Sequence, residues 1–209
     1  MKYICLFFQL YRPFRHRRYR FFDIGNDHYY YNDYANETNT QNFAENSCLP
    51  TNKILVDLAL KFKDKFKVAI SVTGVALDLF ELYVPKVNNS FKELAKTGCV
   101  EFLAETYSHS LASLKDADIF KEQVKLHEQR INQLFGCKPV VFRNTEMIYS
   151  DEIGVHVADM GYKAMLTEGA RHILGWKSPN FLYVNAANPR LKLLMRNFTL
   201  SDDISFRFS

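Results

Sequence analysis

The stretch that decides the fold runs from Pro139 to Leu166 and reads PVVFRNTEMIYSDEIGVHVADMGYKAML. Residues 140–143 form a short apolar run, which is typical of a buried strand. Ser150 can cap a helix because two acidic residues follow it in the first turn, and Gly161 can end that helix. Residues 164–166 form a second short strand. An apolar strand, a covering helix and another apolar strand predict a parallel sheet with helices on its faces.

The same alternation continues on both sides of this stretch. We expect strands at residues 3–8, 66–72, 100–103, 181–184 and 191–195, and helices at residues 52–62, 75–83, 87–96 and 118–136. The polar, aromatic segment 21–37 predicts a long ordered loop. We expect one domain, residues 1–209, of the α/β class with a parallel sheet. We expect no covering helix after the last strands, and we interpret this as a truncation at the C-terminal end.

Composition and charge narrow the class of protein. Apolar residues make up 47% of the chain and charged residues 24%, which is ordinary for a globular domain. Five arginines between residues 12 and 20 could form a nucleic-acid patch, but the rest of the chain is close to neutral. Because a basic run of this kind is more often a solvated or ion-paired segment, we expect no nucleic-acid partner. No apolar run is long enough to span a membrane. The four cysteines form no Cys-x-x-Cys pair, which argues against a zinc ribbon and fits a reduced, cytoplasmic compartment.

Polar side chains follow most of the predicted strands. Parallel sheets carry their sites at the carboxyl ends of their strands, so these side chains are expected to converge. They are Gln9, Tyr11, Thr73, Glu105, Tyr107, His109, Asn144, Glu146, Thr167 and Glu168. The sequence has no glycine-rich phosphate loop and no Gly-x-Ser-x-Gly motif, so nucleotide and serine-hydrolase chemistry are unsupported.

Two carboxylates stand out in the stretch GCVEFLAETYSHSL, residues 98–111. Because alternate residues of a strand share a face, Glu101, Leu103 and Glu105 are expected to point the same way. Carboxylates inside a barrel are costly unless they bind something, which favours a site. The alternative is an edge strand with ordinary surface acids.

Glu146 lies just past the strand at residues 140–143, with Arg143 and Asn144 beside it. A carboxylate that acts as a nucleophile needs a nearby cation or hydrogen-bond donors to stay ionised. The alternative is a structural salt bridge between Glu146 and Arg143. The residues alone leave both interpretations open.

Long segments of the chain resemble glycoside hydrolase family 57, in its α-amylase-like branch. They are residues 19–31 (YRFFDIGNDHYYY), 98–111, 142–149 (FRNTEMIY), 167–180 (TEGARHILGWKSPN) and 200–209 (LSDDISFRFS). The resemblance implies an incomplete seven-stranded β/α barrel, α-glucan substrates and a retaining mechanism that needs no metal or cofactor. The glycosyl intermediate can pass to water or to a sugar, so it implies an α-amylase-like hydrolase or a 4-α-glucanotransferase.

The same resemblance assigns roles to particular residues. It makes Glu146 the nucleophile and places Glu101 and His109 in the site. Together with the positions of polar side chains after the strands, it leads us to expect substrate binding by Glu101, Glu105, Tyr107, His109, Tyr11 and Trp176. The family's general acid is an aspartate that we expect beyond Ser209, so the chain is interpreted as an N-terminal fragment. Where the family has His-Gln-Pro after its first strand, this chain has Tyr11-Arg12-Pro13.

Two other functions remain as alternatives. A metal-dependent polysaccharide deacetylase uses a related barrel and a His-Ser-x-x-His motif, but this chain has Ser113 where the second histidine would stand after His109. A non-catalytic glucan-binding protein is favoured by the replacement at Tyr11 and Arg12. The sequence gives no oligomeric state.

Overall fold

The structure is a computed structural model that describes residues 4–207. Its contacts divide the chain into two compact units, which we call the N-terminal unit and the C-terminal unit. The N-terminal unit runs to Glu101 and includes Gln133–Cys137. The C-terminal unit comprises Phe102–Asn132 and the residues from Lys138 onward.

The N-terminal unit is built on a sheet with the strand order β1-β2-β3. Strands β1 (Phe7–Leu10) and β2 (Val68–Val72) are parallel, and β3 (Val100–Phe102) lies beside β2. Strand β2 is buried along most of its length, as its apolar sequence predicts. The strand expected at residues 3–8 begins outside the described residues, and β1 ends two residues later than expected.

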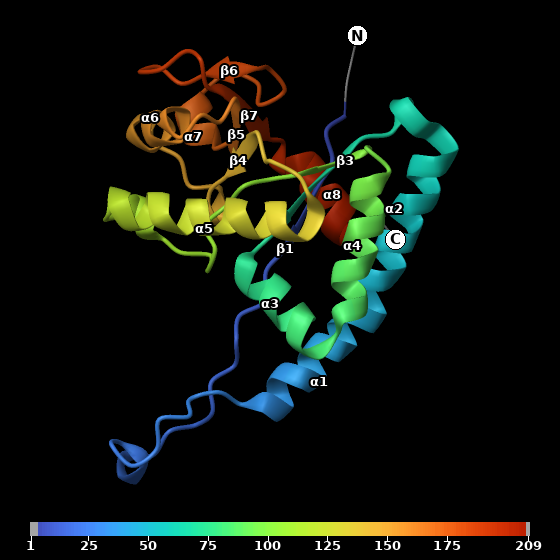
Figure 1. The fold of residues 1–209 in the computed structure, drawn as a ribbon. Helices are drawn as coiled ribbons and strands as arrows, with labels where there is room; N and C mark the ends of the chain where they lie inside the picture. Colours follow the sequence, from blue (N-terminus) through green and yellow to red (C-terminus); the bar gives the residue numbers. More distant parts are fainter. Residues whose placement is uncertain (1–3, 208–209) are drawn as a thin grey trace. The chain divides into compact units, whose positions relative to one another are not determined.

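Helices connect these strands (Figure 1). They are α1 (Asp33–Phe43), a π-helical turn (Ala44–Cys48), α2 (Leu49–Phe62), α3 (Gly74–Tyr83) and α4 (Pro85–Lys96). Thr73 caps α3 by accepting a hydrogen bond from the backbone N–H of Ala76, and Gly98 follows α4 with a φ of +65°. Helix α1 begins inside the segment expected to be a loop. Its sequence, DYANETNTQNF, has few apolar residues, so periodicity could not reveal it.

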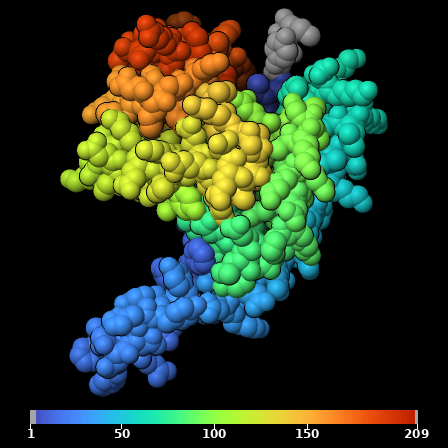
Figure 2. Space-filling view, viewed as in Figure 1, coloured from blue at the N-terminus to red at the C-terminus, as the bar shows by residue number. Residues whose placement is uncertain are grey.

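Residues 14–31 of this unit form a narrow projection, which we call the arm. It extends from the start of α1 in Figures 1 and 2. The backbones of its two sides pair through the bridge between His16 and Tyr31, and a short 3₁₀ helix, Phe21–Asp23, lies at its tip. At its base, buried Asn36 accepts a hydrogen bond from the Arg15 backbone N–H and donates one to the Arg15 carbonyl.

The C-terminal unit contains a second sheet, with the order β4-β5-β7-β6. Strands β4 (Val141–Arg143), β5 (Ala164–Glu168) and β7 (Lys192–Arg196) are parallel, and β6 (Tyr183–Val184) is antiparallel to β7. Ala104 pairs in parallel with Phe142 of β4. The helices are α5 (Ala117–Phe135), whose last turn belongs to the N-terminal unit, α6 (Asp151–Asp159), α7 (Arg171–Leu174) and α8 (Phe198–Phe206).

Helix α6 forms as the sequence predicts, because Ser150 accepts a hydrogen bond from the Ile153 backbone N–H and Gly161 follows the helix with positive φ. The apolar side chains of α6, α5 and the strands share a core that includes Phe120, Phe142 and Met165. We expected no helix after the last strands. This expectation is wrong, because α8 follows β7. No described helix is long and apolar enough to cross a membrane.

Candidate active site

One edge of the sheet in the C-terminal unit gathers the residues that follow its strands. Strands β4 and β5 are parallel, so their carboxyl ends lie on the same edge. Glu146 comes three residues after β4 ends. Glu105 directly follows Ala104, whose parallel pairing with Phe142 brings the segment 105–109 to this edge.

A chain of ionisable side chains connects Glu146 to the interior of the unit. His109 Nε2 lies 2.8 Å from Glu146 Oε1, and His109 Nδ1 lies 3.8 Å from Glu105 Oε2. Arg143 Nη1 lies 3.8 Å from the same Glu105 oxygen. Positive and negative groups therefore alternate in the order Arg143, Glu105, His109 and Glu146.

Burial changes sharply along this chain. The Glu105 side chain is completely buried, and those of Arg143 and His109 are 3% and 7% exposed. The Glu146 side chain is 69% exposed. Buried charges are stable only when partners compensate them, so Arg143 and His109 support the buried Glu105 carboxylate. Glu146 is left open to a ligand arriving from solvent.

The neighbouring carboxylates favour a protonated His109. Glu105 and, to a smaller extent, Glu146 raise the pKa of His109 above its ordinary value of 6.5, against the opposing effect of burial. Burial lowers the pKa of Arg143, while Glu105 and Glu146 oppose that change. An imidazolium between two carboxylates can hold the Glu146 carboxylate in one orientation.

The backbone at this edge is strained. His109, Glu146 and Met147 have φ values of 55°, 52° and 54°, the left-handed region that non-glycine residues seldom adopt. Such conformations cost on the order of 1 kcal/mol each and persist where surrounding contacts fix them. Strain of this kind is often found at functional sites, and here it includes His109 and Glu146, whose side chains contact each other.

Hydrogen bonds between the two loops hold this backbone in place. Thr145 Oγ1 donates to the Ser110 carbonyl at 2.7 Å and lies 2.9 Å from Thr106 Oγ1. The Asn144 amide donates to Ser113 Oγ at 2.9 Å and to the Ile148 carbonyl at 3.0 Å. The segments that carry His109 and Glu146 are thereby joined independently of the contact between those two side chains.

Four of the expected site residues besides Glu146 lie in the C-terminal unit, and the other two, Tyr11 and Glu101, lie in the N-terminal unit. The structure brings Glu105, His109 and Glu146 together, all within the C-terminal unit. Tyr107 is half-buried on the same segment, with its backbone N–H bonded to the Gln123 carbonyl at 3.3 Å. Trp176 lies just after α7, and its side chain is 92% exposed.

Tyr11 and Glu101 belong to the N-terminal unit, so their part in the site stays a prediction. Glu101 and Glu105 were expected to share one face of a strand. Strand β3 ends at Phe102, so strict alternation does not extend to Glu105. The Glu101 side chain is exposed, whereas Glu105 is completely buried.

Several supporting residues were not anticipated from the sequence. The partner shown for Arg143 is Glu105, whereas the salt bridge considered from the sequence was with Glu146. The bonding of Thr106, Ser110 and Thr145 was also missed. The sequence indicates these bonds only through position, since Thr106 and Thr145 each stand beside a glutamate at a strand end.

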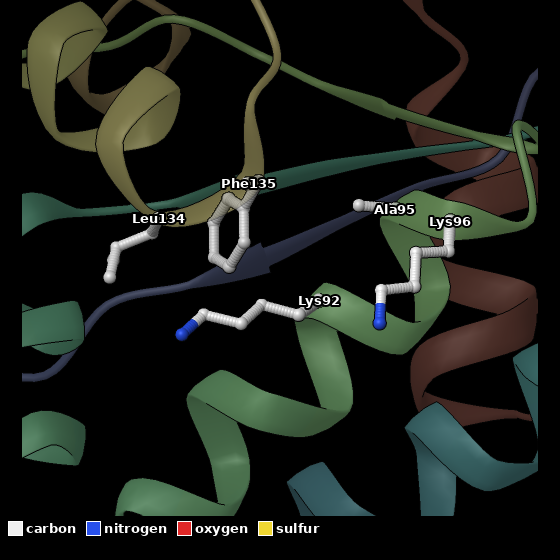
Figure 3. A pocket seen from close by; sticks show the side chains of 5 residues that line it. All are labelled: Lys92, Ala95, Lys96, Leu134 and Phe135. Atoms are coloured by element: carbon white, nitrogen blue, oxygen red, sulfur yellow. The ribbon is translucent and has the colours of Figure 1, made fainter.

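Two other features bear on ligand binding. No group of three histidine, cysteine or acidic side chains that could hold a metal ion occurs within residues 4–207. The N-terminal unit has a shallow pocket of about 230 Å³, lined by Lys92, Ala95, Lys96, Leu134 and Phe135 (Figure 3). No carboxylate lines this pocket.

Comparison with protein-family profiles matches residues 5–209 to the family described as glycosyl hydrolase family 57. A curated protein of Methanocaldococcus jannaschii, described as "Putative alpha-amylase", is 45% identical over 170 residues. That alignment covers 80% of this chain and 36% of the relative. The chain therefore spans about a third of the length of this curated relative.

Solved structures give the same fold. A 4-α-glucanotransferase from Thermococcus litoralis superposes with a TM-score of 0.74 at 14% identity, covering 97% of this chain and 29% of that one. A family 57 branching enzyme from Thermococcus kodakaraensis, in complex with glucose, has a TM-score of 0.69 at 12% identity and covers 100% and 50%. These neighbours agree with the expected fold class, which is α/β with parallel strands and an incomplete seven-stranded β/α barrel.

Proposed function

Because the chain belongs to glycosyl hydrolase family 57, we propose that it carries the nucleophile of a retaining enzyme that acts on α-glucans, and that this nucleophile is Glu146. The observation that carries the proposal is the contact of 2.8 Å between Glu146 Oε1 and His109 Nε2. It gives an otherwise exposed carboxylate a fixed position at the carboxyl edge of a parallel sheet, where such folds carry their chemistry.

The proposed reaction has two steps. A Glu146 oxygen attacks the anomeric carbon as the bond to the leaving oxygen breaks, and a second carboxyl group protonates that oxygen. Water or a sugar hydroxyl then attacks the same carbon, gives its proton to the second carboxylate and releases Glu146. Retaining enzymes hold the two carboxyl groups about 5–5.5 Å apart. We propose that the second group is the family's aspartate, contributed by a part of the enzyme that residues 1–209 do not include.

His109 acts in this proposal as a positioning residue. Its imidazolium binds one Glu146 oxygen and leaves the other oxygen available for attack. Glu105 keeps His109 protonated, and Arg143 compensates Glu105 in the interior. When Glu146 becomes an ester it loses its charge, so the hydrogen bond weakens in the intermediate and strengthens again as the carboxylate is released.

Hydrolysis and glucosyl transfer share this machinery and differ in the acceptor. The curated relative is named as an amylase, which is a hydrolase. Two solved neighbours are named as a glucanotransferase and a branching enzyme, which are transferases. We therefore propose α-glucan as the substrate class and leave both acceptors within the proposal.

A second candidate function is glucan binding without turnover. It is favoured by Tyr11 and Arg12, which stand where the family has histidine and glutamine. The Arg12 guanidinium lies over the Phe43 ring, 3.8 Å from its centroid, so it is engaged in a cation–π contact within the N-terminal unit. Arg12 therefore does not offer the amide group that a glutamine would supply there, and Tyr11 stands where the histidine would be.

A mechanism-based label separates the two functions. A 5-fluoro-α-glucosyl fluoride needs no general acid, because fluoride leaves without a proton, and the fluorine at C5 slows release of the glycosyl enzyme. We expect one glucosyl adduct on the peptide that contains Glu146, located by mass spectrometry. Glu146→Gln should abolish the adduct, and Glu152→Gln, an exposed acid of α6, should retain it.

The outcomes of this labelling are distinct. An adduct on Glu101 or Glu105, or an undiminished adduct in Glu146→Gln, would remove Glu146 from the nucleophile role. No adduct, together with measurable binding of maltooligosaccharides, would support the non-catalytic function.

A further inference from the structure

The carboxyl edge of the C-terminal unit carries a second feature beside the Glu146 site. A pocket of about 450 Å³ opens between the segment that follows β5 and the segment that follows β7. We call it the β5–β7 pocket. Gly169 comes directly after β5, Asn197 comes directly after β7, and both line it. The volume lies in the range of small-ligand sites.

The lining combines apolar surface with hydrogen-bonding groups. Phe198, Leu174 and Leu200 supply the apolar part. The polar side chains are those of Arg171, Lys177, Asn180, Asn197 and Thr199. A glucosyl unit has the matching chemistry, since its ring presents C–H groups on its faces and hydroxyls around its rim. Aromatic and amide side chains bind these two kinds of surface at the same time.

Two contacts show that the pocket is already formed. A Cβ on Gly169 would lie 2.3 Å from the Arg196 carbonyl oxygen, so the two segments touch through backbone and only glycine fits there. The Asn197 amide donates to Asn180 Oδ1 at 3.0 Å, which joins the segments a second time. A preformed site loses less conformational entropy when a ligand binds.

Glu168, which precedes the lining residue Gly169, and Asp202 of α8 both pair with Arg196. Arg196 lies 3.3 Å from Glu168 and 3.1 Å from Asp202, and none of these three side chains is part of the lining. The Asn197 side chain also accepts a hydrogen bond from the Leu200 backbone N–H, which fixes its orientation at the start of α8. The pocket thus offers oriented donors and acceptors without a carboxylate that could act as acid or nucleophile.

The pocket lies on the same edge as Glu146. Strands β4, β5 and β7 are parallel neighbours, so their carboxyl ends follow one another along that edge. Neighbouring strands are about 4.8 Å apart, which puts the end of β7 roughly 10 Å from the end of β4. That separation suits a glucan chain that lies along the edge and reaches a few units past the sugar at Glu146.

We propose that the β5–β7 pocket is a remote subsite, which binds a glucosyl unit of the α-glucan chain whose reacting unit lies at Glu146. The proposal rests on the proposed function for its ligand class. Trp176 lies between the lining residues Gly175 and Lys177, and its 92% exposed ring provides an open surface on which a further sugar can stack.

Nuclear magnetic resonance of the chain tests this subsite. The backbone amides of Gly169 and Gly175 report on the pocket directly. We expect maltoheptaose to shift both signals in a saturable titration, and maltose to bind more weakly because it cannot span both sites. Phe198→Ala should weaken maltoheptaose binding by about tenfold, whereas Phe206→Ala, an exposed ring farther along α8, should leave it unchanged.

A second variant covers the case in which Phe198→Ala unfolds. Asn180→Ala lies on an exposed loop and should also reduce maltoheptaose affinity. Gly169 and Gly175 signals that stay fixed with every maltooligosaccharide would overturn the subsite, even if Glu146 is labelled. Shifts with inorganic phosphate but not with maltoheptaose would also overturn it. Shifts with maltoheptaose without Glu146 labelling would retain the subsite and reject the nucleophile.

Discussion

The loop that carries Glu146, residues 144–150, and the arm at residues 14–31 are both irregular segments, but they are held in opposite ways. In the Glu146 loop, Asn144, Thr145 and Met147 are buried, and the Glu146 side chain between them is 69% exposed. In the arm, Phe21 and Phe22 are 80% and 82% exposed at the tip.

The difference lies in where the stabilising contacts come from. The Glu146 loop is bonded to a segment more than thirty residues away, at Ser110 and Ser113. Apart from bonds to residues 32–36 at its base, the arm is held by contacts between its own residues, such as the stacking of Tyr19 on Tyr30 and the ion pair of Arg17 with Asp27. Segments with few buried contacts open locally at low free-energy cost. Long-range bonds are therefore what allow irregular backbone to position a reacting group.

The largest expected effect is on catalysis, and it tests whether the Glu146 loop positions a catalytic group. In a form of the protein that turns over α-glucans, Glu146→Ala should lower activity by several orders of magnitude, because the attacking group is gone. Added azide should restore turnover and give a β-glycosyl azide from an α-linked substrate, identified by proton NMR. An α-azide, or near-normal activity without azide, would contradict the nucleophile role. Glu152→Ala is the matched control.

The next effect is on stability and tests the buried end of the site. Arg143→Met leaves the buried Glu105 carboxylate without its guanidinium, which should lower the free energy of unfolding by about 3–5 kcal/mol. Urea unfolding followed by circular dichroism measures the change. Arg207→Met, which removes an exposed partner of Asp203, should have little effect. Equal losses in the two variants would mean that Arg143 does not compensate a buried charge.

A smaller effect concerns pH. The folded-state pKa of His109 is raised above 6.5, so protonation of His109 stabilises the fold fully below that value. This contribution should disappear as pH rises from about 6.5 through the raised pKa. The difference in unfolding free energy between the wild type and His109→Gln should therefore shrink on going to alkaline pH. A difference that grows with pH would show that His109 is neutral in the folded protein.

The smallest effect sharpens the contrast between the two segments. Chymotrypsin should cut first after Phe21 or Phe22 in the arm, and the equally irregular Glu146 loop should resist cutting at Tyr149. Asn36→Ala removes both side-chain bonds to Arg15 and should speed cutting in the arm while leaving Glu146 labelling unchanged. Mass spectrometry of the early fragments measures this. If chymotrypsin cuts first after Tyr149, the Glu146 loop opens more easily than the arm, which contradicts this prediction.

The regular part of the C-terminal unit could be predicted from the sequence. Strand β4, helix α6 and strand β5 appear within a few residues of their expected positions, because apolar runs, the Ser150 cap and Gly161 all act locally. Helices α1 and α8 were missed. The first lacks an apolar stripe, and the second is a short helix near the end of the chain whose N-cap is Asn197. The antiparallel pairing of β6 was not expected either.

The candidate site was predictable only in part. The positions of Glu105, His109 and Glu146 after their strands suffice to expect them at one edge, because parallel strands share the direction of their carboxyl ends. The contact of Arg143 with Glu105 and the bonding of Thr145 depend on three-dimensional packing of distant segments, which leaves no local pattern. The left-handed backbone at Glu146 could not be predicted either, since sequence patterns indicate such backbone mainly at glycine and asparagine.

The left-handed residues also govern which substitutions the site can accept. At His109, Glu146 and Met147 a β-branched side chain clashes with its own backbone, whatever its polarity. In a library that covers every amino acid, valine and isoleucine should be depleted at these positions even under selection for folding alone. Glycine and asparagine should survive that selection at position 146 and disappear only under selection for turnover. Mutational tolerance would thus measure separately how much of each residue's constraint comes from backbone shape and how much from chemistry.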